Sequence, residues 1–183
     1  MTTADAVRSA FPELEEIRDE QLRQQVLDVW VRAVDDSGYD DLEAVPWWPP
    51  AERNLEGGTV PTIEHVGAVT RIAIGIADSM AESVGTEIDR DVVVAGALLH
   101  DISKLYELDG EDTGELHEWV PHPHYGVHVL ADAGFPAHLQ HIAVSHSPNS
   151  AVEPRTIEAE IVSRADELAV QGLFWKRNGT LRP

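Results

Sequence analysis

The adjacent residues His100 and Asp101 follow directly on the apolar run Val92–Leu99. An imidazole and a carboxylate are poor core residues, because burying them is costly unless each is paired or ligated. Spread over about a hundred residues, four further candidate ligands flank the pair along the chain: His65, His122, His146 and Asp166. Histidines and carboxylates in this order are typical of a metal site assembled from several helices.

The chain contains no cysteine, so any bound metal must be held by nitrogen and oxygen atoms. Such donors suit Mn, Fe, Co, Ni, Zn or Mg. The candidate ligands could hold one ion or, if the central carboxylate bridges, two. Two divalent ions a few ångströms apart clamp a phosphoryl group and activate water near neutral pH. The sequence therefore predicts a hydrolase with one or two divalent metal ions.

Each candidate ligand also has a structural interpretation when it is taken alone. His65 could be an ordinary core or surface histidine. The pair His100-Asp101 could be a charge pair at the end of a helix, and Asp166 could form a surface salt bridge. Their combination in one order favours the metal site. Three nearby histidines are alternatives to His122 or His146 as ligands: His124, His128 and His141.

Five stretches of the chain resemble the HD-domain superfamily of metal-dependent phosphohydrolases, over about residues 60–170: Glu64-His65-Val66, His100-Asp101-Ile102-Ser103-Lys104, His122-Pro123-His124-Tyr125-Gly126, Ile142-Ala143-Val144-Ser145-His146 and Ala165-Asp166-Glu167-Leu168. The resemblance implies an all-α, HD-domain-like helical bundle. It also implies a core ligand set made of His65, His100, Asp101 and Asp166. His122 and His146 match positions that hold a second metal in binuclear members of the superfamily.

The resemblance further implies that Lys104, one turn beyond His100, contacts substrate phosphate. Asp101 and Lys104 are thus the expected catalytic residues, and Arg71 and Arg164 are candidates to assist them. The expected reaction is hydrolysis of a small phosphorylated molecule, a nucleotide or cyclic nucleotide. Alternatives are a di-iron oxygenase of HD type and a non-catalytic regulatory HD module.

Two departures from related sequences narrow the expected class of substrate. The His-Pro-x-x-Gly pattern at 122–126 is similar to that of HD-GYP phosphodiesterases, but the Gly-Tyr-Pro motif of those proteins is missing. Ser145-His146 stands where many members have His-His. Hydrolysis of cyclic-di-GMP is therefore not expected.

The expected elements are helices separated by turn-rich segments. Apolar residues at three- and four-residue steps predict the longer helices, and the breaks fall at glycine and proline. We expect an N-terminal helix and a Pro/Trp-rich loop (1–60) packed on a metal-binding HD domain (61–172), then a tail (173–183), in a single globular unit. Helices are predicted over 11–36, 62–84, 90–107, 123–133, 137–146 and 156–171, with a loop over 46–61 and a solvated acidic loop over 108–115.

The composition narrows the expected binding partners of the protein and its expected cellular compartment. A formal net charge of −20 over 183 residues argues against binding a nucleic-acid polymer through a basic face. The sequence shows no signal peptide and no apolar run long enough for a membrane span, which predicts a cytoplasmic protein. Acidity with only two lysines, Lys104 and Lys176, suits either a high-salt cytoplasm or an arginine-biased genome. An oligomer is possible.

Overall fold

A computed structural model describes residues 2–39, 41–48, 58, 60–109, 112–113 and 115–182. Over these residues the fold is all-α, as the sequence predicts, apart from two strands of two residues each. In chain order, the elements are α1 (Thr3–Ala10), η1 (Pro12–Glu16), α2 (Glu20–Ser37), η2 (Leu42–Ala44), α3 (Thr62–Val84), α4 (Arg90–Leu99), α5 (Lys104–Glu107), β1 (Leu108–Asp109), β2 (Asp112–Thr113), α6 (Glu115–Trp119), α7 (His122–Asp132), α8 (Ala137–Ser145) and α9 (Ile157–Asn178).

Helix α4 is the centre of the bundle. Its residues 93–99 are all buried, as expected for a helix that is apolar all round. Asp89 caps its N-terminus by accepting a hydrogen bond from the backbone N–H of Val92. The elements that pack against α4 include η1, α2, α3, α8 and α9. The end of α4 therefore opens into the middle of the molecule, where the candidate ligands meet.

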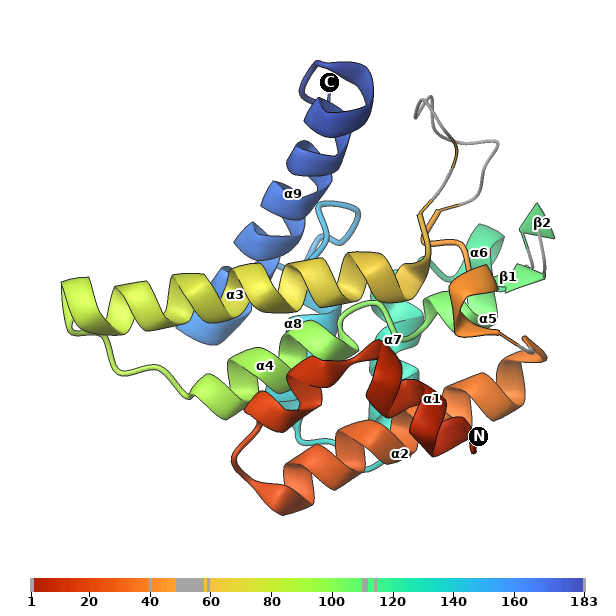
Figure 1. The fold of residues 1–183 in the computed structure, drawn as a ribbon, viewed down its shortest axis with the longest axis horizontal. Helices are drawn as coiled ribbons and strands as arrows, with labels where there is room; N and C mark the ends of the chain where they lie inside the picture. Colours follow the sequence, from red (N-terminus) through yellow and green to blue (C-terminus); the bar gives the residue numbers. More distant parts are fainter. Residues whose placement is uncertain are drawn as a thin grey trace.

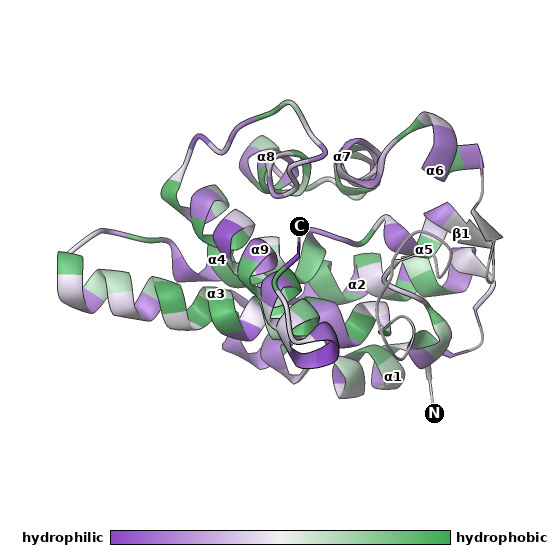
Figure 2. Ribbon diagram, turned by 90° about the horizontal axis from the view of Figure 1, so that it is seen from above, coloured by the Kyte–Doolittle hydropathy of each residue, from purple (hydrophilic) through white to green (hydrophobic). Residues whose placement is uncertain are grey.

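The remaining long helices surround α4 (Figure 1). Helix α9 crosses α3 and packs against it, whereas α7 and α8 pack side by side in a separate layer (Figure 2). Apolar and polar residues alternate along α3 in the same view, as one buried face and one solvent face require. Helices α1 and α2 close the side of α4 remote from α7 and α8.

The predicted helix over 11–36 is wrong in its first half. The chain forms α1 before it, ends that helix at Phe11, makes the 3-10 turn η1 and starts α2 only at Glu20. Pro12 has no N–H to continue α1, and Asp19 caps α2 by accepting from two backbone N–H groups. Phe11 is fully buried against Trp30, with ring centroids 4.6 Å apart.

The predicted helix over 90–107 is interrupted at His100–Ser103. Here the backbone turns with i→i+3 hydrogen bonds, such as Lys104 N–H to Asp101 O at 3.0 Å. The imidazole of His100 donates from Nδ1 to Ala97 O at 2.6 Å. In a continuous helix that carbonyl would accept from Asp101, so the side chain of His100 replaces the backbone donor at the helix end.

Other predicted boundaries need smaller corrections. Helix α9 runs to Asn178, seven residues beyond the predicted end at 171, and stops at Gly179 in the left-handed conformation. Part of the predicted acidic loop forms an antiparallel pair, with Leu108 opposite Thr113 and Asp109 opposite Asp112; residues 110, 111 and 114 lie outside the described residues. Most of the predicted loop over 46–61 also lies outside them, namely 49–57 and 59. None of the described helices combines the length and hydropathy of a bilayer span.

Gly96 is where α4 and α8 pack most closely. A Cβ atom at this position would lie 2.6 Å from Cδ1 and 3.0 Å from Cγ2 of the buried Ile142. Gly96→Ala is therefore expected to lower the free energy of unfolding by about 1–3 kcal/mol in urea titrations. Gly75→Ala is the matched control, because nothing lies within 4 Å of its added Cβ. It should raise that free energy by about 0.5–1 kcal/mol; an equal loss in both variants would contradict the packing argument.

Candidate metal centre

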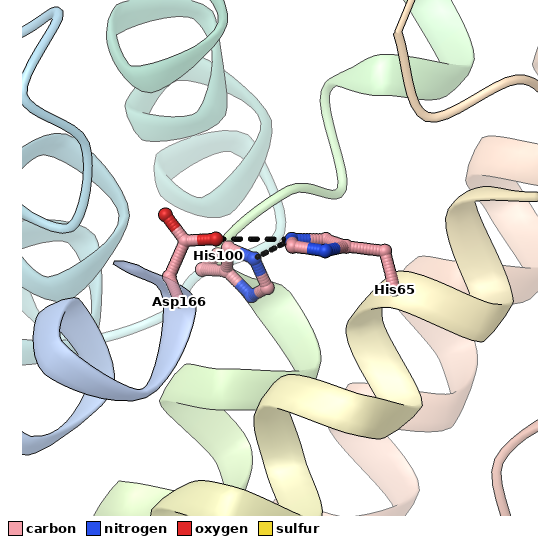
Figure 3. A group of neighbouring side chains, drawn as sticks. All are labelled: His65, His100 and Asp166. Carbon is pink, nitrogen blue, oxygen red and sulfur yellow. Dashed lines mark hydrogen bonds and ion pairs between the residues drawn. The ribbon is translucent and has the colours of Figure 1, made fainter. Parts of the chain in front are cut away.

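The six predicted ligands converge from four helices and the turn after α4. His65 comes from the first turns of α3, His100 and Asp101 from the end of α4, and Asp166 from the middle of α9. His122 begins α7 and His146 follows α8. All six residues are at most 9% exposed. Figure 3 shows His65, His100 and Asp166 pointing toward one another from three separate helices.

The carboxylate of Asp101 lies between two pairs of histidines. Its Oδ2 atom is 3.6 Å from Nε2 of both His65 and His100. Its Oδ1 atom is 3.5 Å from Nε2 of both His122 and His146. Asp166 joins the first pair, with Oδ1 3.0 Å from Nε2 of His65. Each oxygen of Asp101 thus faces a different pair of imidazoles.

Two of the histidines are oriented by the carbonyl groups of their own helices. His100 Nδ1 lies 2.6 Å from Ala97 O, and His146 Nδ1 lies 2.8 Å from Ala143 O. A carbonyl only accepts, so Nδ1 must carry the proton in both rings. In a neutral ring, this leaves the lone pair on Nε2, the atom that faces Asp101. Both residues stand at a helix C-terminus, where unpaired carbonyls are available.

Burial sets the protonation of the cluster. It lowers the pKa of His100 to about 4 and, with help from the charge of Lys104, holds the pKa of His122 well below its ordinary value. Burial opposes ionisation of Asp101, but the adjacent histidines, led by His100, hold its pKa well below the ordinary value. At neutral pH, neutral His100 and His122 therefore lie beside the ionised carboxylate of Asp101, in the states that metal ligands require. For His146, burial opposes protonation, but the carboxylate of Asp101 raises the pKa of the ring above its ordinary value.

These donors fit a divalent cation. Nε2 of His100 lies 3.4 Å from Nε2 of His65, close to the separation of about 3.3–3.4 Å between two nitrogens that share one tetrahedral ion. Asp101 Oδ1 is buried and, among the described residues, has no hydrogen-bond partner. A buried carboxylate oxygen without a partner is costly, and a cation would satisfy it. Among the described residues, two groups have ligand atoms that all lie within 4.8 Å of one another: His65, His100 and Asp166, and His100, Asp101 and His146.

Lys104 brings a positive charge to the same place. Its side chain is 1% exposed, and its Nζ atom lies 3.5 Å from Oε2 of Glu107 and 5.0 Å from the ring centroid of Trp48. Glu107 is itself fully buried and also faces His117, whose Nδ1 is 3.3 Å from Oε2. His117 is therefore partly buried beside Glu107.

A small pocket of about 20 Å³ leads to the cluster, roughly the room of a single water molecule. The residues that line it are Trp47, Trp48, Asp101, Lys104, His122, His146, Ser147, Pro148, Asn149, Asp166, Val170 and Arg182. A larger cavity of about 540 Å³ lies between α1, the end of α2 and the start of α3, and none of the cluster residues lines it.

The structure distinguishes His122 and His146 from the three histidines that were alternatives to them as ligands. His124 and His128 are exposed, whereas His122 is buried beside Asp101. His141 accepts a hydrogen bond from the backbone N–H of Arg155 at 3.0 Å. His122 and His146 are thus the histidines that this part of the chain brings to Asp101.

The two arginines expected to assist do not line the pocket. Arg71 pairs with Glu13, and Arg164 pairs with Glu160 and Glu167 on the outer face of α9. The arginine that does line it is Arg182, which sequence reasoning missed. It follows the end of α9, and its backbone N–H donates to Gln171 at 2.7 Å. No spacing pattern links it to the other residues, so only the folded chain identifies it.

Comparison with known proteins places the bundle in a family. The HD domain family model matches residues 62–171, which carry all six clustered side chains. The chain belongs to the HD domain family. This confirms the resemblance seen in the sequence, and the all-α architecture agrees with it.

One curated relative of this HD-domain protein is the dihydroneopterin 2',3'-cyclic phosphate phosphodiesterase of Methanocaldococcus jannaschii. The two are 36% identical over 168 residues, which cover 84% of this chain and 64% of the relative. The chain thus spans just under two thirds of the relative's length. No solved structure shows a significant match to this HD-domain chain.

Proposed function

We propose that the protein is a metal-dependent phosphodiesterase that acts on a small phosphorylated molecule. The position of Asp101, with one oxygen toward His65 and His100 and the other toward His122 and His146, carries the proposal. Membership of the HD domain family and the name of the relative support it.

The ligand roles follow the two faces of Asp101. His65, His100, Asp101 and Asp166 would hold one divalent ion, and His122 and His146 would hold a second ion with Asp101 as the bridge. Divalent ions there would lower the pKa of water and polarise phosphoryl oxygens. The carboxylates of Asp101 and Asp166 would keep the negative charge that binds such ions, and the buried rings of His100 and His122 would supply neutral nitrogens.

The other residues of the pocket would act on the substrate. Lys104 would neutralise charge that develops on the phosphoryl oxygens, and Arg182 would add a second cation at the pocket. Hydrolysis adds water across one P–O ester bond, so that the hydroxyl joins phosphorus and the proton ends on the leaving alkoxide. Trp48 offers a flat ring beside Lys104 for a planar part of the substrate.

The proposed substrate class is a 2',3'-cyclic phosphate attached to a small heterocyclic compound. The substrate in the relative's name supports a cyclic diester over a monoester. The small pocket and the formal charge of −20 disfavour a nucleic-acid polymer. In the pocket lining, Lys104 and Arg182 balance the charges of Asp101 and Asp166, whereas the chain as a whole is strongly acidic.

Hydrolysis assays on the purified protein test the proposal. We would supply Mn²⁺, Zn²⁺ or, without oxygen, Fe²⁺, and follow ³¹P resonances of dihydroneopterin 2',3'-cyclic phosphate, 2',3'-cyclic AMP and p-nitrophenyl phosphate. The expected result is ring opening of a cyclic phosphate to a monoester, with the monoester substrate unchanged. Loaded protein that hydrolyses none of the three would contradict the proposal, and dioxygen-dependent turnover with iron would identify an oxygenase instead.

A further inference from the structure

Trp47 lies outside the segment that the HD domain family model matches, residues 62–171, yet it reaches the metal centre. Its side chain is 3% exposed. Its backbone N–H donates to Val60 O at 2.9 Å, next to a bridge between Pro46 and Pro61. Its ring belongs to a small apolar cluster with Val60, Val170 and Phe174. Trp47 is therefore held in place independently of the ligand cluster.

Trp47 makes two different contacts with the candidate ligands. Its indole Nε1–H donates to Oδ2 of Asp101 at 2.8 Å. Its ring stacks on the imidazole of His65, with centroids 3.9 Å apart and planes inclined by 18°. One side chain thus touches the proposed bridging carboxylate and one of the histidines that this carboxylate faces.

The two contacts fix different degrees of freedom. The hydrogen bond holds the rotation of the Asp101 carboxylate, because an indole N–H can only donate and Oδ2 is its acceptor. With Oδ2 held, Oδ1 faces His122 and His146. The stack holds the ring plane of His65 and therefore the direction of its Nε2 lone pair. Groups that hold ligands in this way commonly change metal affinity 10–100-fold when removed.

We propose that Trp47 is a positioning residue of the metal centre, which orients Asp101 and His65 for metal binding from a segment outside the matched HD domain. The inference rests on the proposed metal-dependent function. It predicts that metal affinity depends on the indole N–H of Trp47 and not simply on the bulk of the ring.

Trp47→Phe is the direct test, because it keeps an aromatic ring against His65 and removes the N–H. We expect the Kd for Mn²⁺, measured by equilibrium dialysis on the full chain, to rise about 10–100-fold. Hydrolysis of bis(p-nitrophenyl) phosphate should then need correspondingly more Mn²⁺, while KM at saturating Mn²⁺ changes less than the metal requirement. Should this variant fail to fold, benzothienylalanine at position 47 keeps the bicyclic ring and removes only the N–H.

Two other tryptophans serve as controls. Trp30 is fully buried and donates from Nε1 to Leu98 O at 3.0 Å, so Trp30→Phe removes an equivalent hydrogen bond from the core. It should lower the melting temperature and leave the Kd for Mn²⁺ within about twofold. Trp175 is 62% exposed, and Trp175→Phe should change neither quantity.

The outcomes separate this inference from the function on which it rests. A Kd for Mn²⁺ in Trp47→Phe within twofold of wild type would overturn the role of Trp47 and leave the metal centre intact. Equal rises in Trp47→Phe and Trp30→Phe would also overturn it, because the effect would then come from general destabilisation. Wild-type protein that binds no Mn²⁺ would instead reject the metal-dependent function itself.

Discussion

Asp101→Asn is expected to lower kcat on a cyclic phosphate by about 10³-fold or more. The substitution keeps the size of the side chain and replaces one carboxylate oxygen by an NH₂ group, so the two histidine pairs no longer share an anionic ligand. Metal catalysis supplies several kcal/mol of stabilisation to the transition state, and about 1.4 kcal/mol corresponds to tenfold in rate. Steady-state rates together with bound metal per chain would measure the effect.

The control for Asp101→Asn is Asp132→Asn. Asp132 is an aspartate of α7 that pairs with Arg32 at 2.6 Å on the surface. The variant Asp132→Asn should keep wild-type activity and metal content. Normal turnover by Asp101→Asn would contradict the role of Asp101 as a shared ligand.

Lys104→Met is expected to lower kcat/KM by about 10²–10³-fold while the metal content stays at the wild-type level. Methionine keeps most of the length of the buried side chain and removes its charge. If Lys104 acts on phosphoryl oxygens rather than on the metal, only the rate of the chemical step should fall, and metal binding should be unchanged. Rates and elemental analysis on the same preparation distinguish the two effects.

The second lysine of the chain provides the matched control. Lys176 is exposed near the end of α9, so Lys176→Met makes the same chemical change away from the pocket and should leave kcat/KM unchanged. Loss of metal from Lys104→Met would show that Lys104 supports the ligand cluster, against the role proposed for it.

The sequence predicted the family and the helical architecture because most of the cluster residues lie at or near helix ends, where polar side chains next to apolar runs stand out; Asp166, in the middle of α9, is the exception. His100-Asp101 directly after Val92–Leu99 is the clearest example. Spacing alone could not show whether His122 or His124 faces Asp101. His122 begins the helix, and either ring could point inward. Only the packing of α7 against α8 decides which ring is buried.

Two predicted helix boundaries are wrong for local reasons that the spacing of apolar residues does not show. The first predicted helix spans Pro12, where the chain loses a backbone donor, although apolar residues recur across the break. The helix over 90–107 ends early because the side chain of His100 takes the carbonyl of Ala97. The same hydrogen bond orients His100 in the cluster, so the break that periodicity missed is part of the site.

The pocket residues outside residues 62–171 were the hardest to foresee. The structure places both Trp47 and Trp48 in the pocket lining and packs Trp47 in one apolar cluster with Phe174. Phe174 is buried as a packing residue, whereas Trp175 is exposed. Arg182 reaches the pocket through the turn after α9, a tertiary contact that has no signature in the sequence.

The metal content per chain tests whether Asp101 and the five candidate ligands around it bind divalent ions. We would measure Mn, Fe, Co, Ni and Zn by plasma mass spectrometry in the wild type, His122→Ala and His124→Ala after reconstitution with each metal. We expect about two metal ions per chain in the wild type and in His124→Ala, because the exposed ring of His124 does not bind metal. We expect about one metal ion per chain in His122→Ala. A wild-type protein that holds none of these metals would contradict metal binding by these residues.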